Sequence, residues 1–208
     1  MAWPPIRGRF RFACLVIFLI ALASLTSSGY QQRLDSEAIR EAFSLGRRSD
    51  QTTGVFLSKY VKTFPAMEKW PHVGRIDLLT PYAQIVYDAK DDLQNNNVLD
   101  AEQKYGSVDM PLIVRVQAFW ATLSDLPTED KDVWGHFEIS VSQGHSLTPK
   151  KRAWLPYYVT RGEMPGFDYI VYELQFDTKT VASAPITIDV SSRDGQHVEA
   201  KFDLSKLK

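Results

Sequence analysis

One ten-residue run constrains the fold of this chain more than any other stretch. Residues 167–176 (FDYIVYELQF) are rich in aromatic and β-branched side chains, and turn-forming residues lie on both sides of them. At a period of two, one face of this run carries Ile170, Tyr172, Leu174 and Phe176. The run therefore predicts a strand near the centre of a sheet, with this face in a core and the other largely in water.

The same alternation recurs through the last hundred residues. It predicts further strands at 112–120, 134–143, 153–159, 186–190 and 198–202. Pro156 favours an edge position for its strand, and Asp194-Gly195 predicts a hairpin turn. Strands of this kind with regularly spaced turns are typical of an antiparallel β-sandwich, immunoglobulin-like in architecture, which we place at residues 108–208.

The part of the chain before the sandwich has a helical period. Apolar positions and capping residues predict helices at 34–46 and 50–64, a helix beginning at Thr80-Pro81, and one more capped by Asp100. A short apolar segment at 73–79 is predicted as an isolated or edge strand. The sequence thus indicates an α+β protein, with a helical region at 30–107 followed by the sandwich.

The first 29 residues have the composition of an export signal. Three arginines within residues 7–11 precede an apolar run at 13–25, and small residues follow. Because a membrane span needs roughly 20 apolar residues, the run favours a signal peptide cleaved after Ala23 or Ser28. The alternative is an uncleaved anchor. We therefore predict a periplasmic or extracellular protein with no stable membrane span after cleavage.

Composition excludes several classes of function. Of the 208 residues, 44% are hydrophobic and 12% aromatic, which excludes a chain that is disordered throughout. The net charge is -1, and loss of the leader removes three basic and no acidic residues, so nucleic-acid binding is not expected. The only cysteine, Cys14, lies in the leader, so the exported product would have no disulfide and no thiolate chemistry. No cofactor is predicted.

Three stretches occur together in this chain: residues 39–48 (IREAFSLGRR), residues 79–86 (LTPYAQIV), and residues 194–200 (DGQHVEA), which run on into FDL. The combination resembles a group of uncharacterised exported bacterial proteins of the kind abundant in acidobacteria. This resemblance implies export and an order of helices before a β domain. It implies no catalytic residues.

The histidines suggest one metal-binding arrangement. His136 alternates with Glu138 on one predicted strand, and His197 with Glu199 on another, so the four could bind a divalent ion if those strands were neighbours. The alternative is ordinary polar residues on a solvated sheet face, which alternation alone predicts. Because alternation is sufficient, and no motif of nucleophilic catalysis occurs, neither catalytic residues nor a metal site are predicted.

Aromatic residues are the better candidates for a binding site. Alternation directs Trp134, Trp154 and Tyr158 away from the core of the predicted sandwich, where they could stack on sugar rings or anchor a protein. The alternative is that they pack against the helical region.

We predict an exported, non-catalytic binding module of the cell envelope or extracellular space. Its ligand would be an envelope protein or a polysaccharide. The alternative function is a secreted hydrolase with its site between the helical region and the sandwich.

Overall fold

A computed structural model describes residues 30–208 except 69, 92–96, 121–129, 162–163 and 194. Helices and strands follow in the order α2 (Ser36–Gly46), α3 (Gln51–Ser58), β1 (Val61–Thr63), β2 (His72–Leu79), α4 (Pro81–Asp91), α5 (Val98–Tyr105), β3 (Leu112–Phe119), α6 (Asp130–His136), β4 (Phe137–Ser142), β5 (Lys151–Arg161), β6 (Met164–Phe176), β7 (Pro185–Ser192) and β8 (His197–Asp203). Two single-turn 3₁₀ helices, Thr178–Thr180 and Leu204–Lys206, complete the secondary structure of the described residues.

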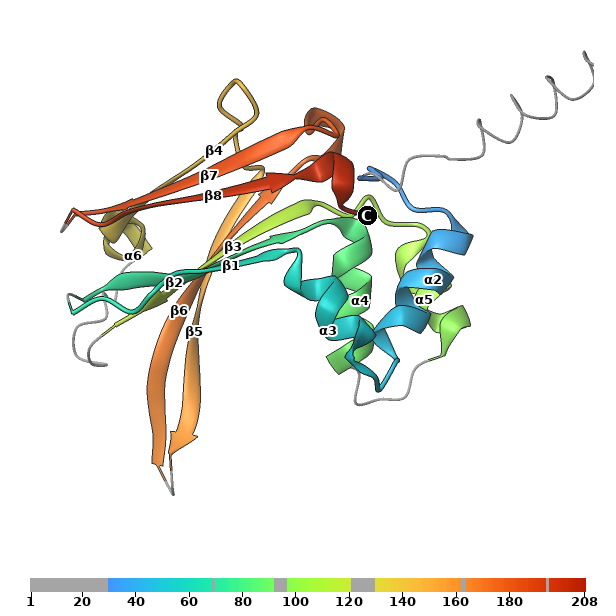
Figure 1. Cartoon of the computed structure of the whole chain (residues 1–208), viewed down its shortest axis with the longest axis horizontal. Helices are drawn as coiled ribbons and strands as arrows, with labels where there is room; N and C mark the ends of the chain where they lie inside the picture. The colour runs from blue at the N-terminus through green and yellow to red at the C-terminus, as the bar shows by residue number, and fades with distance from the viewer. Residues whose placement is uncertain (1–29, 69, 92–96, 121–129, 162–163, 194) are drawn as a thin grey trace, which may run out of the picture.

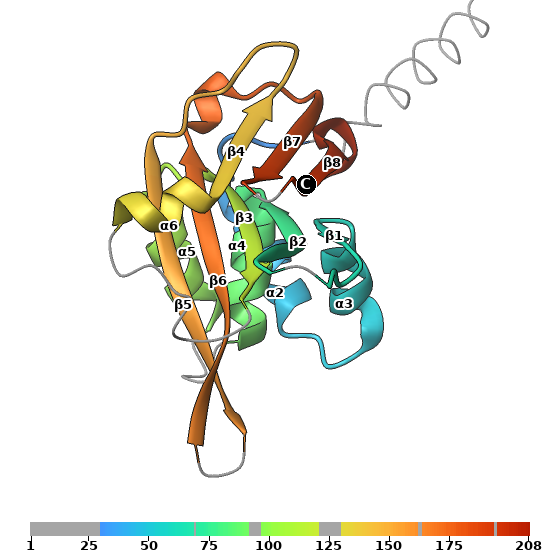
Figure 2. The same cartoon turned by 90° about the vertical axis from the view of Figure 1, so that its left-hand side faces the viewer.

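Two antiparallel sheets form the body of the molecule (Figure 1). The large sheet has five strands in the order β1-β2-β3-β6-β5, and the small sheet has three in the order β4-β7-β8. The small sheet covers one face of the large sheet, and β5 and β6 continue beyond the rest of the large sheet as a long hairpin (Figures 1 and 2). The prediction of an α+β protein with antiparallel sheets is therefore confirmed.

The main core lies between the two sheets. The face of β6 predicted to be buried is almost fully excluded from water: Ile170 and Tyr172 are 0% exposed and Leu174 is 1% exposed. These side chains pack with alternate residues of β2 and β3 and with the inward residues of the small sheet. Burial of an apolar side chain of this size contributes about 1.5–3 kcal/mol, so this shared core holds the sheets together.

Helices α2, α3, α4 and α5 form a second cluster at one end of the large sheet (Figure 1). Asp35 caps α2, accepting a hydrogen bond from the Ala38 backbone N–H, and Asp50 caps α3 in the same way. Thr80 accepts from the N–H of Ala83 at the start of α4. These starts agree with the predictions. α5 begins one turn earlier than expected, because Asn97 and Asp100 together form a capping box.

The second predicted helix is shorter than expected, and the strand that follows the helical hairpin is not at an edge. α3 ends at Ser58, and Val61–Thr63 pairs as β1 with β2, which also pairs with β3. The large sheet thus takes two strands from the region predicted to be helical. One of the two pairing partners of β2, the strand β3, lies more than 30 residues away along the chain, and a local pattern does not contain this pairing.

The strand predicted at 134–143 begins three residues late. Residues 130–136 form α6, so Trp134 and His136 lie on a helix and the alternating pattern holds only from Phe137. The Trp134 ring packs edge-on against Tyr172, with 5.2 Å between ring centroids. Packing against the core has therefore overridden the local strand preference of this segment.

The predicted signal peptide at residues 1–29 lies outside the described residues. In the part of the chain that the structure describes, no helix is long and apolar enough to cross a membrane.

Candidate functional site: an open face of the large sheet

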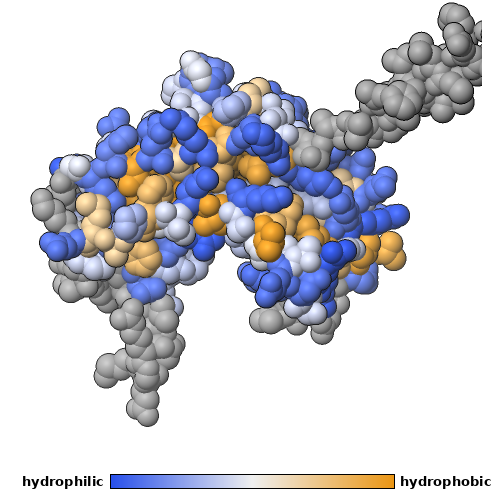
Figure 3. Space-filling view, in the orientation of Figure 1, coloured by the Kyte–Doolittle hydropathy of each residue, from blue (hydrophilic) through white to orange (hydrophobic). Residues whose placement is uncertain are grey.

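The face of the large sheet that points away from the small sheet is only partly covered. The helices lie over one end of it, and the β5–β6 hairpin extends beyond the other end (Figures 1 and 2). Figure 3 shows the molecule hollowed on this side, between the helical part and the rest. We call this surface the open face. It is our candidate functional site.

An aromatic row crosses the open face from strand to strand. It consists of Trp70, His72, Phe119, Tyr169 and Tyr157. The sheet register explains this alignment, because His72 is opposite Phe119, Phe119 opposite Tyr169, and Tyr169 opposite Tyr157. Residues directly opposite each other in adjacent strands share a face and lie within side-chain contact.

Each ring of the aromatic row contacts the next. The centroid distances along the row are 4.6, 5.6, 5.7 and 4.9 Å, within the range of favourable aromatic pairs. Tyr157 and Tyr169 are nearly parallel, at 16°, and His72 and Phe119 are stacked at 24°. In each of these two stacked pairs, the neighbouring ring covers one face of each ring.

The ends of the row are exposed. Trp70 is 45% exposed and Tyr157 is 42% exposed, and beside Tyr157 on the same face Leu155 is 48% exposed. A glycine holds the middle of the row close to the sheet, because a Cβ atom on Gly74 would collide with the Phe119 ring. The row is thus a fixed, partly apolar ridge with its most accessible side chains at its two ends.

Charged side chains lie next to the aromatic row, toward the helices. Arg75 contacts Asp77 (Nε to Oδ1, 2.7 Å), and Arg115 contacts Glu173 (Nε to Oε2, 2.9 Å). Gln175 donates to the other Glu173 oxygen at 2.8 Å. The carboxylate side chains are only 15% and 11% exposed, whereas both arginines are more than a third exposed. The open face therefore presents guanidinium groups above largely buried carboxylates.

Burial changes the pKa of the Asp77 carboxyl group. Loss of hydration raises the pKa of its carboxyl group above the usual value of 3.8, and the neighbouring Arg75 opposes this shift without cancelling it. An acid with a raised pKa in the folded state binds protons more tightly there than in the unfolded state. Its contribution to stability is present below pH 3.8 and is lost as the pH rises through the folded pKa.

We therefore expect Asp77→Asn to change the pH dependence of stability. The difference in unfolding free energy between Asp77→Asn and the unchanged protein should shift in favour of the variant as the pH rises above 3.8. Urea denaturation at several pH values measures this difference. Asp109→Asn is the control, because the pKa of exposed Asp109 is lowered by its hydrogen bond with Lys179. A difference for Asp77→Asn that stays constant with pH would contradict the expectation.

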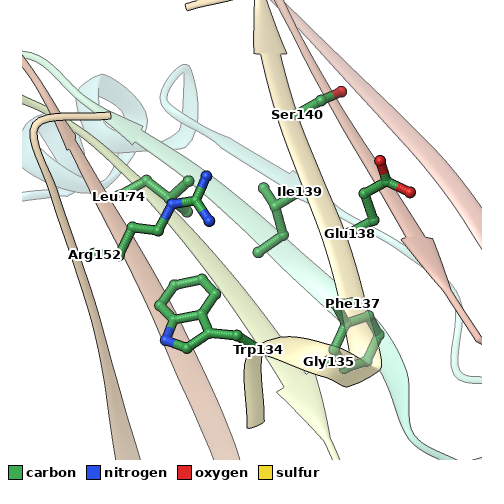
Figure 4. A pocket seen from close by; sticks show the side chains of 8 residues that line it. All are labelled: Trp134, Gly135, Phe137, Glu138, Ile139, Ser140, Arg152 and Leu174. Carbon is green, nitrogen blue, oxygen red and sulfur yellow. The ribbon is translucent and has the colours of Figure 1, made fainter. Parts of the chain in front are cut away.

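A second concave site, which we call the seam pocket, opens between the edge strands β4 and β5. Its volume is about 360 Å³. Arg152 and Ile139 point into it from opposite strands, Glu138 points away, and the ring of Trp134 lies at one end (Figure 4). The Arg152 guanidinium lies 5.8 Å from the centre of the Trp134 ring. Leu174 forms part of the wall, so the pocket reaches the main core.

The structure separates the three aromatic residues predicted from sequence. Trp134 lines the seam pocket and packs on Tyr172. Trp154 is half-buried and packs against the main core, opposite Tyr172 in the sheet register. Tyr158 is 56% exposed on the hairpin. They do not form one surface, because Trp134 and Trp154 pack against the main core and Tyr158 is exposed.

The histidine and glutamate pairs do not meet either. β4 and β8 lie on opposite sides of β7, so Glu138 and Glu199 belong to strands that are not neighbours. His197 instead lies 3.4 Å from Asp189 of β7. Among the described residues, no group of three or more His, Cys, Asp or Glu side chains could hold a metal ion.

The aromatic row was not identified from sequence, although part of its signal was present. Phe119 and Tyr169 occupy the outward-facing positions of strongly alternating strands, and Tyr157 lies next to the edge-marking Pro156. What the sequence does not contain is the register that aligns them. Trp70 is in a turn-rich connector, where no period predicts its direction.

Comparison of the chain with models of protein families, with curated proteins and with solved structures found no match. The functional proposal is therefore argued from the site geometry and from the sequence.

Proposed function

We propose that this protein is an exported, non-catalytic binding module whose contact surface is the open face of the large sheet. The observation that supports this proposal is the aromatic row, with Trp70 and Tyr157 exposed at its ends beside Leu155. Tryptophan and tyrosine are enriched among residues that dominate binding energy at protein interfaces. Two arginines next to the row add groups that recognise carboxylates or backbone carbonyls.

Between the two predicted ligands, a protein segment suits the open face better than a polysaccharide. Sugars stack on exposed ring faces, whereas Tyr157 and Tyr169 cover one face of each other. The aromatic row can contact apolar side chains, and its two tyrosine hydroxyls can hydrogen-bond a peptide backbone. We therefore propose an envelope or extracellular protein as the partner.

Two parts of this proposal rest on the sequence. Export, to the periplasm or outside the cell, rests on the leader composition of residues 1–29 and on the resemblance to exported bacterial proteins. The immunoglobulin-like arrangement, with short N-terminal helices followed by the sandwich, remains a prediction. The described fold has two antiparallel sheets and helices that alternate with the strands of the large sheet.

Substitution of the two exposed ends of the aromatic row tests the contact surface. A partner is first identified by cross-linking to envelope proteins, and its affinity is then measured by isothermal titration calorimetry. We expect Trp70→Ala and Tyr157→Ala each to weaken binding about tenfold or more, as truncation of an aromatic residue that dominates binding does at protein interfaces. Both side chains are more than 40% exposed, so the melting temperature should change little.

Tyr158→Ala is the matched control, because Tyr158 is the next residue and is 56% exposed. It should leave the affinity unchanged. If Tyr158→Ala abolished binding and Tyr157→Ala did not, the contact surface would lie elsewhere, as the original prediction from sequence had it. If the variants weakened binding to a polysaccharide and not to a protein, the partner class would be wrong.

A further inference from the structure

A second pocket lies where the helices meet the edge of the large sheet. Its volume is about 430 Å³, and α3, α4, β1 and β2 all contribute to its wall. We call it the helix–sheet pocket. Leu57 and Val61 form an apolar side, and Arg75, Tyr87 and Lys90 form a polar one. None of the residues that line it carries a carboxylate.

The side chains on the polar side, Arg75, Tyr87 and Lys90, can donate hydrogen bonds to an anion. Tyr87 accepts a hydrogen bond from Arg75 (Nη2 to Oη, 3.2 Å), so its own hydroxyl hydrogen remains available. Burial raises the pKa of Tyr87, which keeps the phenol protonated at neutral pH. Asp77 binds the Nε edge of Arg75, and the remaining N–H groups of the guanidinium have no carboxylate among the lining residues. Lys90 then adds a positive charge that Asp77 does not offset.

Gly54 supports the interpretation of this pocket as a binding site, because neither its backbone conformation nor its surroundings require a glycine. Other glycines of the described chain are explained by their surroundings: a side chain on Gly46 would meet the backbone of α4, and Gly144 and Gly195 have positive φ angles. A Cβ on Gly54 would meet nothing within 4 Å. A glycine inside a helix lowers its stability by roughly 1 kcal/mol relative to alanine. What Gly54 does provide is a low wall on the α3 side of the helix–sheet pocket.

We propose that the helix–sheet pocket binds a small organic anion, a carboxylate or a phosphate monoester with a short hydrocarbon part. The anionic group would lie against Arg75, Tyr87 and Lys90, and the hydrocarbon part against Leu57 and Val61. The pocket shares Arg75 with the open face, but its other lining residues lie on α3, α4 and β1, away from Tyr157 on β5, so the two proposals can fail separately.

Titration with three matched compounds tests the proposal. Hexanoate and hexyl phosphate carry the two anionic groups on the same hydrocarbon chain, and 1-hexanol is their uncharged counterpart. We expect at least one of the anions to bind the purified protein, as seen by shifts in its ¹H–¹⁵N spectrum and by calorimetry. The stronger of the two identifies the anion class, and 1-hexanol should bind about tenfold more weakly or not at all.

Two variants assign that binding to the pocket. Lys90→Gln should weaken anion binding about tenfold, since it removes a charged donor from an exposed position. Gly54→Leu should abolish binding of the anions by filling the pocket, without lowering the melting temperature, because leucine is a better helix former than glycine.

Lys62→Gln is the matched control. Lys62 lies between two strand residues that line the pocket, but its side chain points to the other face of β1, with its Nζ 5.7 Å from the centre of the Phe202 ring. It should bind the anions like the unchanged protein. The proposal is overturned if neither anion binds, if 1-hexanol binds as tightly as they do, or if Lys90→Gln and Gly54→Leu both bind unchanged. Loss of anion binding in Trp70→Ala would instead place the site on the aromatic row.

Discussion

Replacement of Tyr172 by alanine is expected to lower the free energy of unfolding by about 3–5 kcal/mol, the range found for large aromatic residues in protein cores. Tyr172 is 0% exposed, and its ring contacts those of Trp134 and Phe137 at 5.2 and 5.5 Å. Its hydroxyl donates to the carbonyl oxygen of Val133 at 3.0 Å. One side chain of β6 thus holds α6 and the start of β4 against the large sheet. Urea denaturation measures the loss.

A milder change at the same position separates packing from hydrogen bonding. Tyr172→Phe keeps the ring and leaves the buried Val133 carbonyl without this donor, which should lower the free energy of unfolding by about 1–3 kcal/mol. This variant provides a test even if Tyr172→Ala does not fold. Tyr157→Phe, at an exposed tyrosine, is the control and should change stability by less than about 0.5 kcal/mol. Equal stability of Tyr172→Phe and the unchanged protein would show that the hydrogen bond contributes nothing net.

Alanine substitutions at two helical glycines should have opposite effects. A Cβ on Gly46 would lie 2.5 Å from the Val86 carbonyl oxygen and 2.7 Å from the Ala89 Cβ, so α2 and α4 would have to move apart. Overpacking of this kind destabilises by about 1–3 kcal/mol. Gly54→Ala meets no atom and should stabilise the protein by up to about 1 kcal/mol.

Each of these two variants is the control for the other, because both substitutions add one methyl group to a helix. Thermal and urea denaturation of the two variants, measured against the unchanged protein, give the sign of each effect. If Gly46→Ala were as stable as the unchanged protein, α2 and α4 would not be in the close contact described here. If Gly54→Ala were less stable, the glycine would have a conformational role, and its interpretation as an open pocket wall would lose its support.

The sequence predicted those elements whose signal is local. The alternation of residues 167–176 identified β6 and the inward direction of Tyr172, and caps identified the starts of α2, α3 and α4. One local prediction was only half right: the outward face of β6 is not largely in water, because Glu173 is 9% exposed beneath Arg115 and Gln175. A single strand does not show what its neighbours place over it.

The predictions that were wrong, and the site, depend on partners outside the local segment. β2 lies inside the large sheet because β1 and β3 pair with it. Trp134 lies on a helix, where its ring packs against the ring of Tyr172. The aromatic row needs the register of three separate strand pairings before its rings line up. The same residues could be named from the sequence only as isolated aromatics. Their assembly is a property of the sheet.

The order of strands along the chain has a consequence for how the protein folds. β4 is inserted between β3 and β6 in the chain but belongs to the other sheet, and β7 and β8 follow only after the large sheet is complete. Neither sheet is therefore formed by one continuous segment of the chain. β3 pairs with β6, and the Arg115–Glu173 contact between them joins residues 58 positions apart. Contacts this distant in sequence slow folding to roughly milliseconds or seconds in β-rich domains. Because the two sheets share one core, they should unfold together, in one cooperative step.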